Sequence, residues 1–174
     1  MFVFVILAAL GLLASCGTQS RPVDAFSIVN ANGRTVRLGD SRSIVEKLLG
    51  PQEQVVTEFE EDGTERVQYL KTTDVLVDFN GGKLCAIRLE NPEWKLASGF
   101  TIGSAEKDVL EVFDKNQALQ YPGYNGLWMS IDSEGKQIDF DENSEYQLRF
   151  DFKKGQVVLI MLQNNVAPDR PWMN

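Results

Sequence analysis

Two carboxylates at matching places in the chain are the residues that could do acid–base chemistry. Asp78 stands in "LVDFNGGKLCAIRL" and Asp151 in "FDFKKGQVVLIML", each a few residues before a glycine turn. Two carboxylates that flank a glycosidic bond can act as acid and as base or nucleophile. Equivalent positions also fit one structural role used twice, at a turn or on a sheet face. We expect the structural role, with a catalytic pair as the alternative.

The other side chains restrict the chemistry further. The chain has no histidine, so Ser-His-Asp and Cys-His catalysis are excluded and the commonest zinc ligand is missing. Cys85 lies in an apolar alternating run, which is typical of a small buried side chain rather than of a reactive thiol. The sequence contains no phosphate-binding loop and no metal-spaced cysteine set. We expect a protein that is not an enzyme and needs neither cofactor nor metal.

An acidic stretch over residues 139–145 places oxygen-bearing side chains at alternate positions, which are Asp139, Asp141, Asn143 and Glu145. The pattern resembles the start of an EF-hand calcium loop. It differs at two decisive places, because Ser144 replaces the glycine of that loop and Phe150 replaces its bidentate glutamate. We expect a solvated acidic hairpin tip, with a calcium site as the alternative.

The first residues of the chain read as an export signal. No charged side chain occurs from Phe2 to Ala14, a run of 13 residues that is too short to span a bilayer but suits the apolar part of a signal peptide. Leu13, Ala14 and Ser15 then precede Cys16. This order resembles the bacterial lipobox, which implies that the thiol of Cys16 carries a diacylglycerol, that the leader is removed just before it, and that the new amino terminus is acylated with a fatty acid such as palmitate.

Lipidation at Cys16 defines where the protein is expected to be. Each buried methylene contributes roughly 0.8 kcal/mol, so two or three acyl chains anchor a protein stably in a membrane. Gly17 follows the cysteine, which in a double-membrane bacterium resembles outer-membrane sorting. We therefore expect a lipid-anchored protein of the cell envelope, on the outer membrane where the bacterium has one, facing either the periplasm or the surface.

Composition limits the partners of the mature chain. Without residues 1–15 the chain has 174 − 15 = 159 residues, and it keeps all 17 basic and 25 acidic side chains, a net charge of −8. An acidic surface disfavours nucleic acid and anionic lipid, and favours solubility or a basic partner. With Cys16 lipidated, Cys85 has no cysteine left for an intramolecular disulfide.

Two segments of the chain repeat. "VRLGDSRSIVEKLLGP" matches "GFTIGSAEKDVLEVFDK" at an offset of 64, which aligns Gly39 with Gly103. Each segment predicts a strand end, a glycine turn and a short helix, with Asp40 or Ser41 and then Ser104 as expected helix caps. The two stretches around Asp78 and Asp151 match at an offset of 73, and each predicts a hairpin.

The repeats predict an α+β fold of two tandem units, each a short helix packed on an antiparallel sheet of about four strands. The expected organisation has six parts: a signal peptide at 1–15, a tether at 16–24, a first repeat at 25–90, a linker at 91–98, a second repeat at 99–164 and an irregular tail at 165–174. The aliphatic-Gly-polar-Ser pattern, with its valine, Gly-x-Pro and glycine hairpin, resembles the small lipoproteins of outer-membrane β-barrel assembly. In its doubled form it resembles the β-lactamase inhibitor protein. This resemblance covers residues from about 34 to 163 and implies binding rather than catalysis.

An aromatic cluster is the candidate partner-binding site. Tyr121, Tyr124 and Trp128 lie in "YPGYNGLWM", inside the extra residues of the second repeat, where proline and glycine predict a loop. Aromatic side chains on loops are frequent interface anchors. The alternative is that they close the end of the second sheet.

These observations favour a non-enzymatic, membrane-anchored lipoprotein that binds a protein partner, as an inhibitor or adaptor does. The first alternative is a structural subunit of an envelope or outer-membrane assembly complex. The second is a hydrolase of envelope polymers that uses carboxylates. No binding to nucleic acid is expected.

Overall fold

The structure is a computed structural model of the whole chain, and it describes residues 24–50, 54–59, 65–72, 75–119, 123 and 125–165. Cys16, Tyr121 and Tyr124 lie outside these residues. The described elements are, in chain order, β1 (Ser27–Asn30), β2 (Thr35–Arg37), α1 (Arg42–Leu49), β3 (Gln54–Phe59), β4 (Glu65–Thr72), β5 (Val75–Asn80), β6 (Lys83–Leu89), β7 (Trp94–Leu96), α2 (Glu106–Val112), the 3-10 turn η1 (Lys115–Gln117), β8 (Gly126–Ile131), β9 (Gln137–Ile138), β10 (Tyr146–Lys153) and β11 (Gln156–Asn164).

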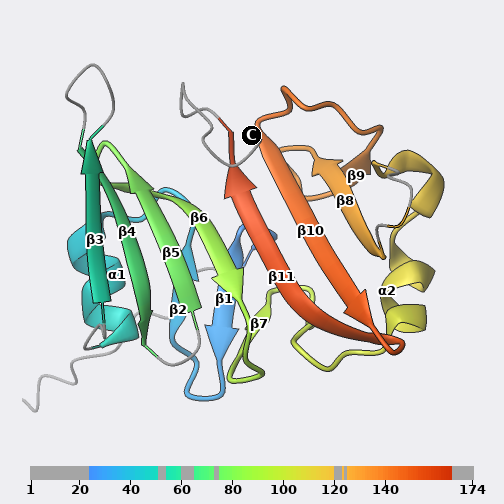
Figure 1. Cartoon of the computed structure of the whole chain (residues 1–174), viewed down its shortest axis with the longest axis horizontal. Helices are drawn as coiled ribbons and strands as arrows, with labels where there is room; N and C mark the ends of the chain where they lie inside the picture. The colour runs from blue at the N-terminus through green and yellow to red at the C-terminus, as the bar shows by residue number, and fades with distance from the viewer. Residues whose placement is uncertain are drawn as a thin grey trace, which may run out of the picture.

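One large antiparallel sheet organises the molecule (Figure 1). Its strand order is β3-β4-β5-β6-β11-β10-β8-β9. The strands before β7 and the strands after it meet in the middle of this sheet, where β6 pairs with β11 from Leu89↔Ile160 to Ala86↔Gln163. Because β6 and β11 are also antiparallel, β3–β6 and β8–β11 form one continuous antiparallel sheet.

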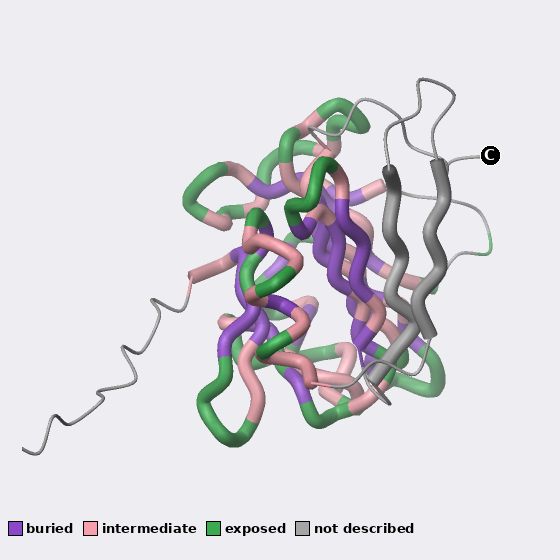
Figure 2. Tube along the Cα trace, turned by 90° about the vertical axis from the view of Figure 1, so that its left-hand side faces the viewer, coloured by how far each residue is buried: buried purple, intermediate pink, exposed green. Residues whose placement is uncertain are grey.

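A small sheet of order β2-β1-β7 forms the second layer, behind the large sheet in Figure 1. Its central strand β1 pairs with β2 on one side and with β7 on the other, where Ile28 lies opposite Leu96. The strand β7 therefore comes from the segment expected to be a linker. The side view in Figure 2 shows buried residues in the strands of both layers and exposed residues in the connecting loops.

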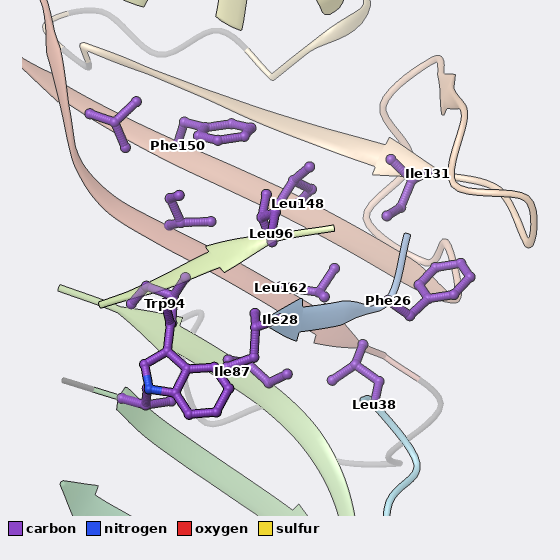
Figure 3. Close-up of a cluster of buried hydrophobic side chains, with 14 of the residues drawn as sticks. Phe26, Ile28, Leu38, Ile87, Trp94, Leu96, Ile131, Leu148, Phe150 and Leu162 are labelled. Atoms are coloured by element: carbon purple, nitrogen blue, oxygen red, sulfur yellow. The ribbon is translucent and has the colours of Figure 1, made fainter. Parts of the chain in front are cut away.

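The hydrophobic core lies between the two sheets (Figure 3). On the core face of β10, Leu148, Phe150 and Phe152 are buried. Ile28 of the small sheet is fully buried, and Figure 3 shows Ile28 and Trp94 beside Ile87 of β6 and Leu96 beside Leu148 of β10. Full burial of one such side chain is worth about 1.5–3 kcal/mol, so this interlayer contact fixes the two sheets to each other.

Each helix begins on a hairpin turn rather than on a side-chain cap. Arg42 N donates to Gly82 O at 3.1 Å, and Glu106 N donates to Gly155 O at 2.9 Å. The expected caps are wrong, because neither α1 nor α2 has a side-chain cap hydrogen bond at its N-cap residue, Ser41 or Ala105. Asp40 and Ser104 instead accept from the backbone three residues earlier, from Arg37 N and Thr101 N, both at 3.0 Å.

The expected α+β fold of two helix-on-sheet units is wrong. The described part of the protein is mostly β, and its short helices α1 and α2 pack on one shared core. The β6–β11 pairing joins β3–β6 and β8–β11 into one large sheet. The repeated segments do not form repeated folding units, but they do form equivalent local hydrogen bonds. Gly39 N donates to Leu84 O and Gly103 N to Val157 O, both at 2.8 Å, at the sequence offsets of 64 and 73.

The two hairpins of the large sheet also share a β-bulge. The register shifts between Asp78 and Phe79 on β5, and between Asp151 and Phe152 on β10, which leaves Cys85 and Val158 as the extra residues of β6 and β11. The sequence predicts a buried Cys85, but the structure shows it half-buried. As the extra residue of a bulge, it lies outside the register pairs of β5 and β6. Its thiol donates to Asp78 O at 3.4 Å.

Candidate functional site on the open face of the large sheet

The face of the large sheet turned away from the small sheet carries the exposed functional groups, and we call it the open face. Strand alternation places them there, because neighbouring residues of a strand point to opposite faces. On β10, Leu148 and Phe150 enter the core, so Gln147, Arg149 and Asp151 lie on the open face.

Five side chains on the open face form a row across neighbouring strands. Strand register aligns Leu76 with Arg88, Arg88 with Met161, Met161 with Arg149, and Arg149 with Trp128. Strands lie about 4.8 Å apart, so this open-face row extends over roughly 19 Å. The side chains of Arg88 and Arg149 are 42% and 31% exposed, and the other three are half-buried. The row therefore presents apolar and cationic groups together.

Trp128 is fixed by contacts with its neighbours. Its indole nitrogen donates to Gln147 Oε1 at 3.1 Å. The guanidinium of Arg149 lies 5.7 Å from the ring centre, and the ring of Phe140 meets it edge-on at 5.8 Å. Leu119 N donates to Trp128 O at 2.8 Å. These contacts hold the ring in one orientation at the end of the row, and they leave it half-buried.

The two arginines of the row are held differently. Arg149 makes a bidentate pair with Asp151, with Nε and a terminal nitrogen at 2.8 and 2.9 Å from the two carboxylate oxygens. Arg88 pairs through a terminal nitrogen with Glu90, and its buried Nε has no hydrogen-bond partner among the described residues. A fork–fork pair fixes a guanidinium more firmly than a single contact does. Arg149 is therefore rigid, whereas Arg88 keeps donor capacity.

A buried amide network supports the Trp128 end of the row. Gln147 is fully buried, and its Oε1 also accepts from Gln163 Nε2 at 2.8 Å. Its Nε2 donates to the carbonyl oxygens of Asp141 and Glu142 at 3.2 and 3.3 Å. Gln163 donates in turn to Asn165 Oδ1 at 2.9 Å. All four hydrogen-bonding positions of the Gln147 amide are used, so the network specifies one arrangement.

The acidic stretch 139–145 covers this end of the open face through its backbone. Ser130 Oγ donates to Asp141 O at 3.0 Å, and Asp141 N donates back to Ser130 Oγ at 2.9 Å. The Asp141 carboxylate accepts from Asn143 N within the loop. Among the residues that the structure describes, no three acidic, histidine or cysteine side chains are grouped to hold a metal ion.

Asp78 and Asp151 are too far apart to act together. Strand register aligns Asp78 with Ala86 on β6, Ala86 with Gln163 on β11, and Gln163 with Gln147 on β10. Asp151 lies four residues beyond Gln147 along β10. Three strand spacings and four residues of rise separate the two side chains by roughly 20 Å. Glycosidase carboxylates lie about 5–9.5 Å apart, so a catalytic pair is ruled out by this geometry.

Two titratable groups at the strand ends have shifted pKa values. A side-chain hydrogen bond to Glu145, together with burial, raises the pKa of Tyr146 above its ordinary 10.0. At the β8–β9 turn, the backbone N–H of Lys136 lowers the pKa of Asp132, whose carboxylate also accepts from Glu134 N. Tyr146 lies on the core side of β10, where its ring is 4.1 Å from that of Phe26, and neither group belongs to the open-face row.

Of the predicted aromatic cluster, the structure places Trp128 on the open face. Arg88, Arg149 and Met161 were not predicted as site residues. The alternation of their strands would have put them on a common face, but only the pairing of β6 with β11 brings them into one row.

Comparison with known proteins gives structural neighbours at low identity. No protein-family model matches the chain, and no curated protein matches it. A cysteine-rich secretory protein from Staphylococcus aureus matches with a TM-score of 0.51 at 9% identity, over 82% of this chain and 48% of that chain. An extracellular protein containing an SCP domain from Bacillus anthracis matches with a TM-score of 0.46 at 10% identity, over 85% of this chain and 49% of that chain. The chain thus spans about half the length of these two neighbours.

A third neighbour is matched over its whole length. The uncharacterized protein YfeY from Escherichia coli gives a TM-score of 0.47 at 11% identity, over 83% of this chain and 100% of that chain. The expected resemblance to β-barrel assembly lipoproteins and to the β-lactamase inhibitor protein is wrong, because the fold matches the S. aureus secretory protein instead. The S. aureus neighbour shows a shared fold and no more.

The expected location is supported at its coarser level. The S. aureus neighbour is described as a secretory protein, which agrees with an envelope or extracellular location. In the part of the chain that the structure describes, no helix has the length and apolarity needed to cross a membrane.

Proposed function

We propose that this chain is a non-enzymatic protein-binding module, held at the cell envelope by a lipid on Cys16. The lipobox-like order of Leu13 to Cys16 supports the anchor. Gly17 supports sorting to the outer membrane in a double-membrane bacterium. The partner is a protein, and the binding surface is the open face of the large sheet.

The open-face row is the observation that carries this proposal. Arginine, methionine and tryptophan are the residue types enriched in protein interfaces, and the row contains all three on adjacent strands. Trp128 and Arg149 are already fixed by hydrogen bonds and ring contacts. Binding to such a surface loses little side-chain entropy, which favours affinity.

A photo-crosslinking experiment tests the proposal. A photoreactive amino acid replaces Met161, in the middle of the row, and the full chain is expressed in its own membranes. A matched control places the same group at Val112 on α2, which is 63% exposed. We expect a discrete crosslinked protein from position 161 and none from position 112.

Two outcomes would change the conclusion. Equal labelling from both positions, or none from position 161, would contradict a binding site on the open face. A single stoichiometric complex that survives purification would instead favour a structural subunit of an envelope assembly complex.

A further inference from the structure

The two edges of the large sheet are built differently. At one edge, β9 consists of the two residues Gln137 and Ile138, so it offers very little backbone to a further strand. At the other edge, β3 runs for six residues, pairs with β4 along its full length, and pairs with no other described strand. Figure 1 shows β3 at the outer left side of the sheet.

Apart from one charged residue, Glu58, the sequence of β3 lacks the usual protection of an edge strand. Proteins block such edges with proline, lysine, a bulge or a very short strand, because unpaired N–H and C=O groups accept another strand. The strand reads QVVTEF, with neither proline nor lysine, and its pairing with β4 is regular from Gln54↔Leu70 to Phe59↔Glu65. Among the described strands only β4 pairs with β3, so the other side of the β3 backbone is where a further strand would pair.

We propose that β3 binds an extended, basic segment of a partner protein, which adds to the large sheet as a ninth strand. The inference rests on the proposed function that the chain binds a protein, and it names the chemistry of that partner. Strand addition supplies main-chain hydrogen bonds, and the side chains of the added strand supply selectivity.

The charge of the chain selects a basic strand. The net charge is −8, which steers cationic partners toward it and repels a second copy of the chain. In sequence, the ten residues from Glu53 to Asp62 include five acidic residues and no basic residue. Within β3 itself the charged residue is Glu58.

Strand register pairs Glu58 of β3 with Arg66 of β4, within the regular β3–β4 ladder. On the other side of β3, Glu58 is the acidic position that an added strand would pair with. A lysine or arginine of the added strand at this position would form a favourable cross-strand pair.

Hydrogen exchange with two synthetic peptides tests this inference. The probe is an octapeptide that alternates valine and lysine, and the control alternates proline and lysine, which keeps the charge but cannot pair as a strand. Both are added to the purified full-length lipoprotein in detergent micelles. We expect slower exchange of amides within 54–59 with the valine peptide alone. Equal protection by both peptides, or by neither, would overturn the inference.

A pair of matched variants tests the role of charge. Glu58→Gln removes the acidic residue of β3, and Glu111→Gln removes an exposed acidic residue of α2. We expect Glu58→Gln to weaken binding of the valine–lysine peptide about threefold, and Glu111→Gln to leave it unchanged. Melting temperatures of both variants check that the fold is retained. Equal effects would mean that only bulk charge attracts the peptide.

The two proposals fail separately. Crosslinking from Met161 without protection of β3 would keep the open face as the binding surface and reject strand addition. Protection of β3 without crosslinking from Met161 would keep strand addition and reject the open face.

Discussion

The indole N–H of Trp128 donates to Gln147 Oε1 at 3.1 Å, and this bond connects the exposed row of the open face to its buried support. The same oxygen accepts from Gln163, and the Gln147 amide nitrogen reaches two backbone carbonyl oxygens. One fully buried side chain thus orients an aromatic ring, a neighbouring strand and a loop. Trp128 is therefore both a structural residue and the aromatic end of the open-face row.

Replacing Gln147 with leucine should destabilise the protein strongly. Leucine has a similar volume but removes the hydrogen bonds of Gln147 to the Trp128 indole and to Glu142 O, and one of the two hydrogen bonds at Gln163 Nε2 and at Asp141 O. Buried groups that lose a hydrogen bond cost about 1–3 kcal/mol each, and partial relaxation should leave a total near 3 kcal/mol. We expect the melting temperature to fall by roughly 6–12 °C. Trp128→Phe is the control, because it removes one donor and should cost about 1 kcal/mol. A neutral Gln147→Leu would show that the network does not specify this end of the sheet.

Gly135 should tolerate alanine less well than Gly155 does. Both glycines have positive φ, +81° and +74°, so alanine strains the backbone at both positions. At Gly135 an added Cβ would also collide with the Cβ of Ala25, whereas at Gly155 it meets nothing within 4 Å. We expect Gly155→Ala to cost about 1 kcal/mol and Gly135→Ala about 2–3 kcal/mol. Chemical denaturation measures both. Equal costs would mean that Ala25 moves away freely.

The local features of this fold could be predicted, and its global arrangement could not. Glycine turns at Gly82 and Gly155 indicated the two long hairpins, and both form. The offsets of 64 and 73 recur as equivalent hydrogen bonds from Gly39 and Gly103. Turn chemistry and local spacing determine such features, which is why the sequence displays them.

The joining of β3–β6 with β8–β11 into one large sheet depends on a long-range pairing. Both β6 and β11 have an alternating apolar pattern, and neither sequence indicates that the two strands pair with each other. The same limit applies to the candidate site. Trp128 was found from its residue type, but Arg88 joins Met161 and Arg149 in the row only through the pairing of β6 with β11.

Stability at alkaline pH should depend on Tyr146. A side-chain hydrogen bond to Glu145 favours the neutral phenol, so the pKa of Tyr146 is raised in the folded protein. A raised folded-state pKa contributes stability that is complete below about pH 10 and is lost as the pH rises through the folded value. We expect the melting temperature to fall more steeply above about pH 10 in the wild type than in Tyr146→Phe. Ultraviolet titration of Glu145→Gln should show the phenol ionising at lower pH. Identical slopes for wild type and Tyr146→Phe would contradict the assignment.

Membrane attachment should depend on Cys16 and not on Cys85. If the thiol of Cys16 carries the acyl chains, Cys16→Ala abolishes the anchor, because the roughly 0.8 kcal/mol of each buried methylene is lost together. We expect the variant to move from the membrane fraction to the soluble exported fraction. Cys85→Ala removes the half-buried bulge thiol and should remain membrane-bound. Fractionation in high salt separates lipid anchoring from charge attraction, which an acidic chain of net charge −8 does not favour. A Cys16→Ala variant that stays with the membrane in high salt would show that something other than the lipid holds the protein there.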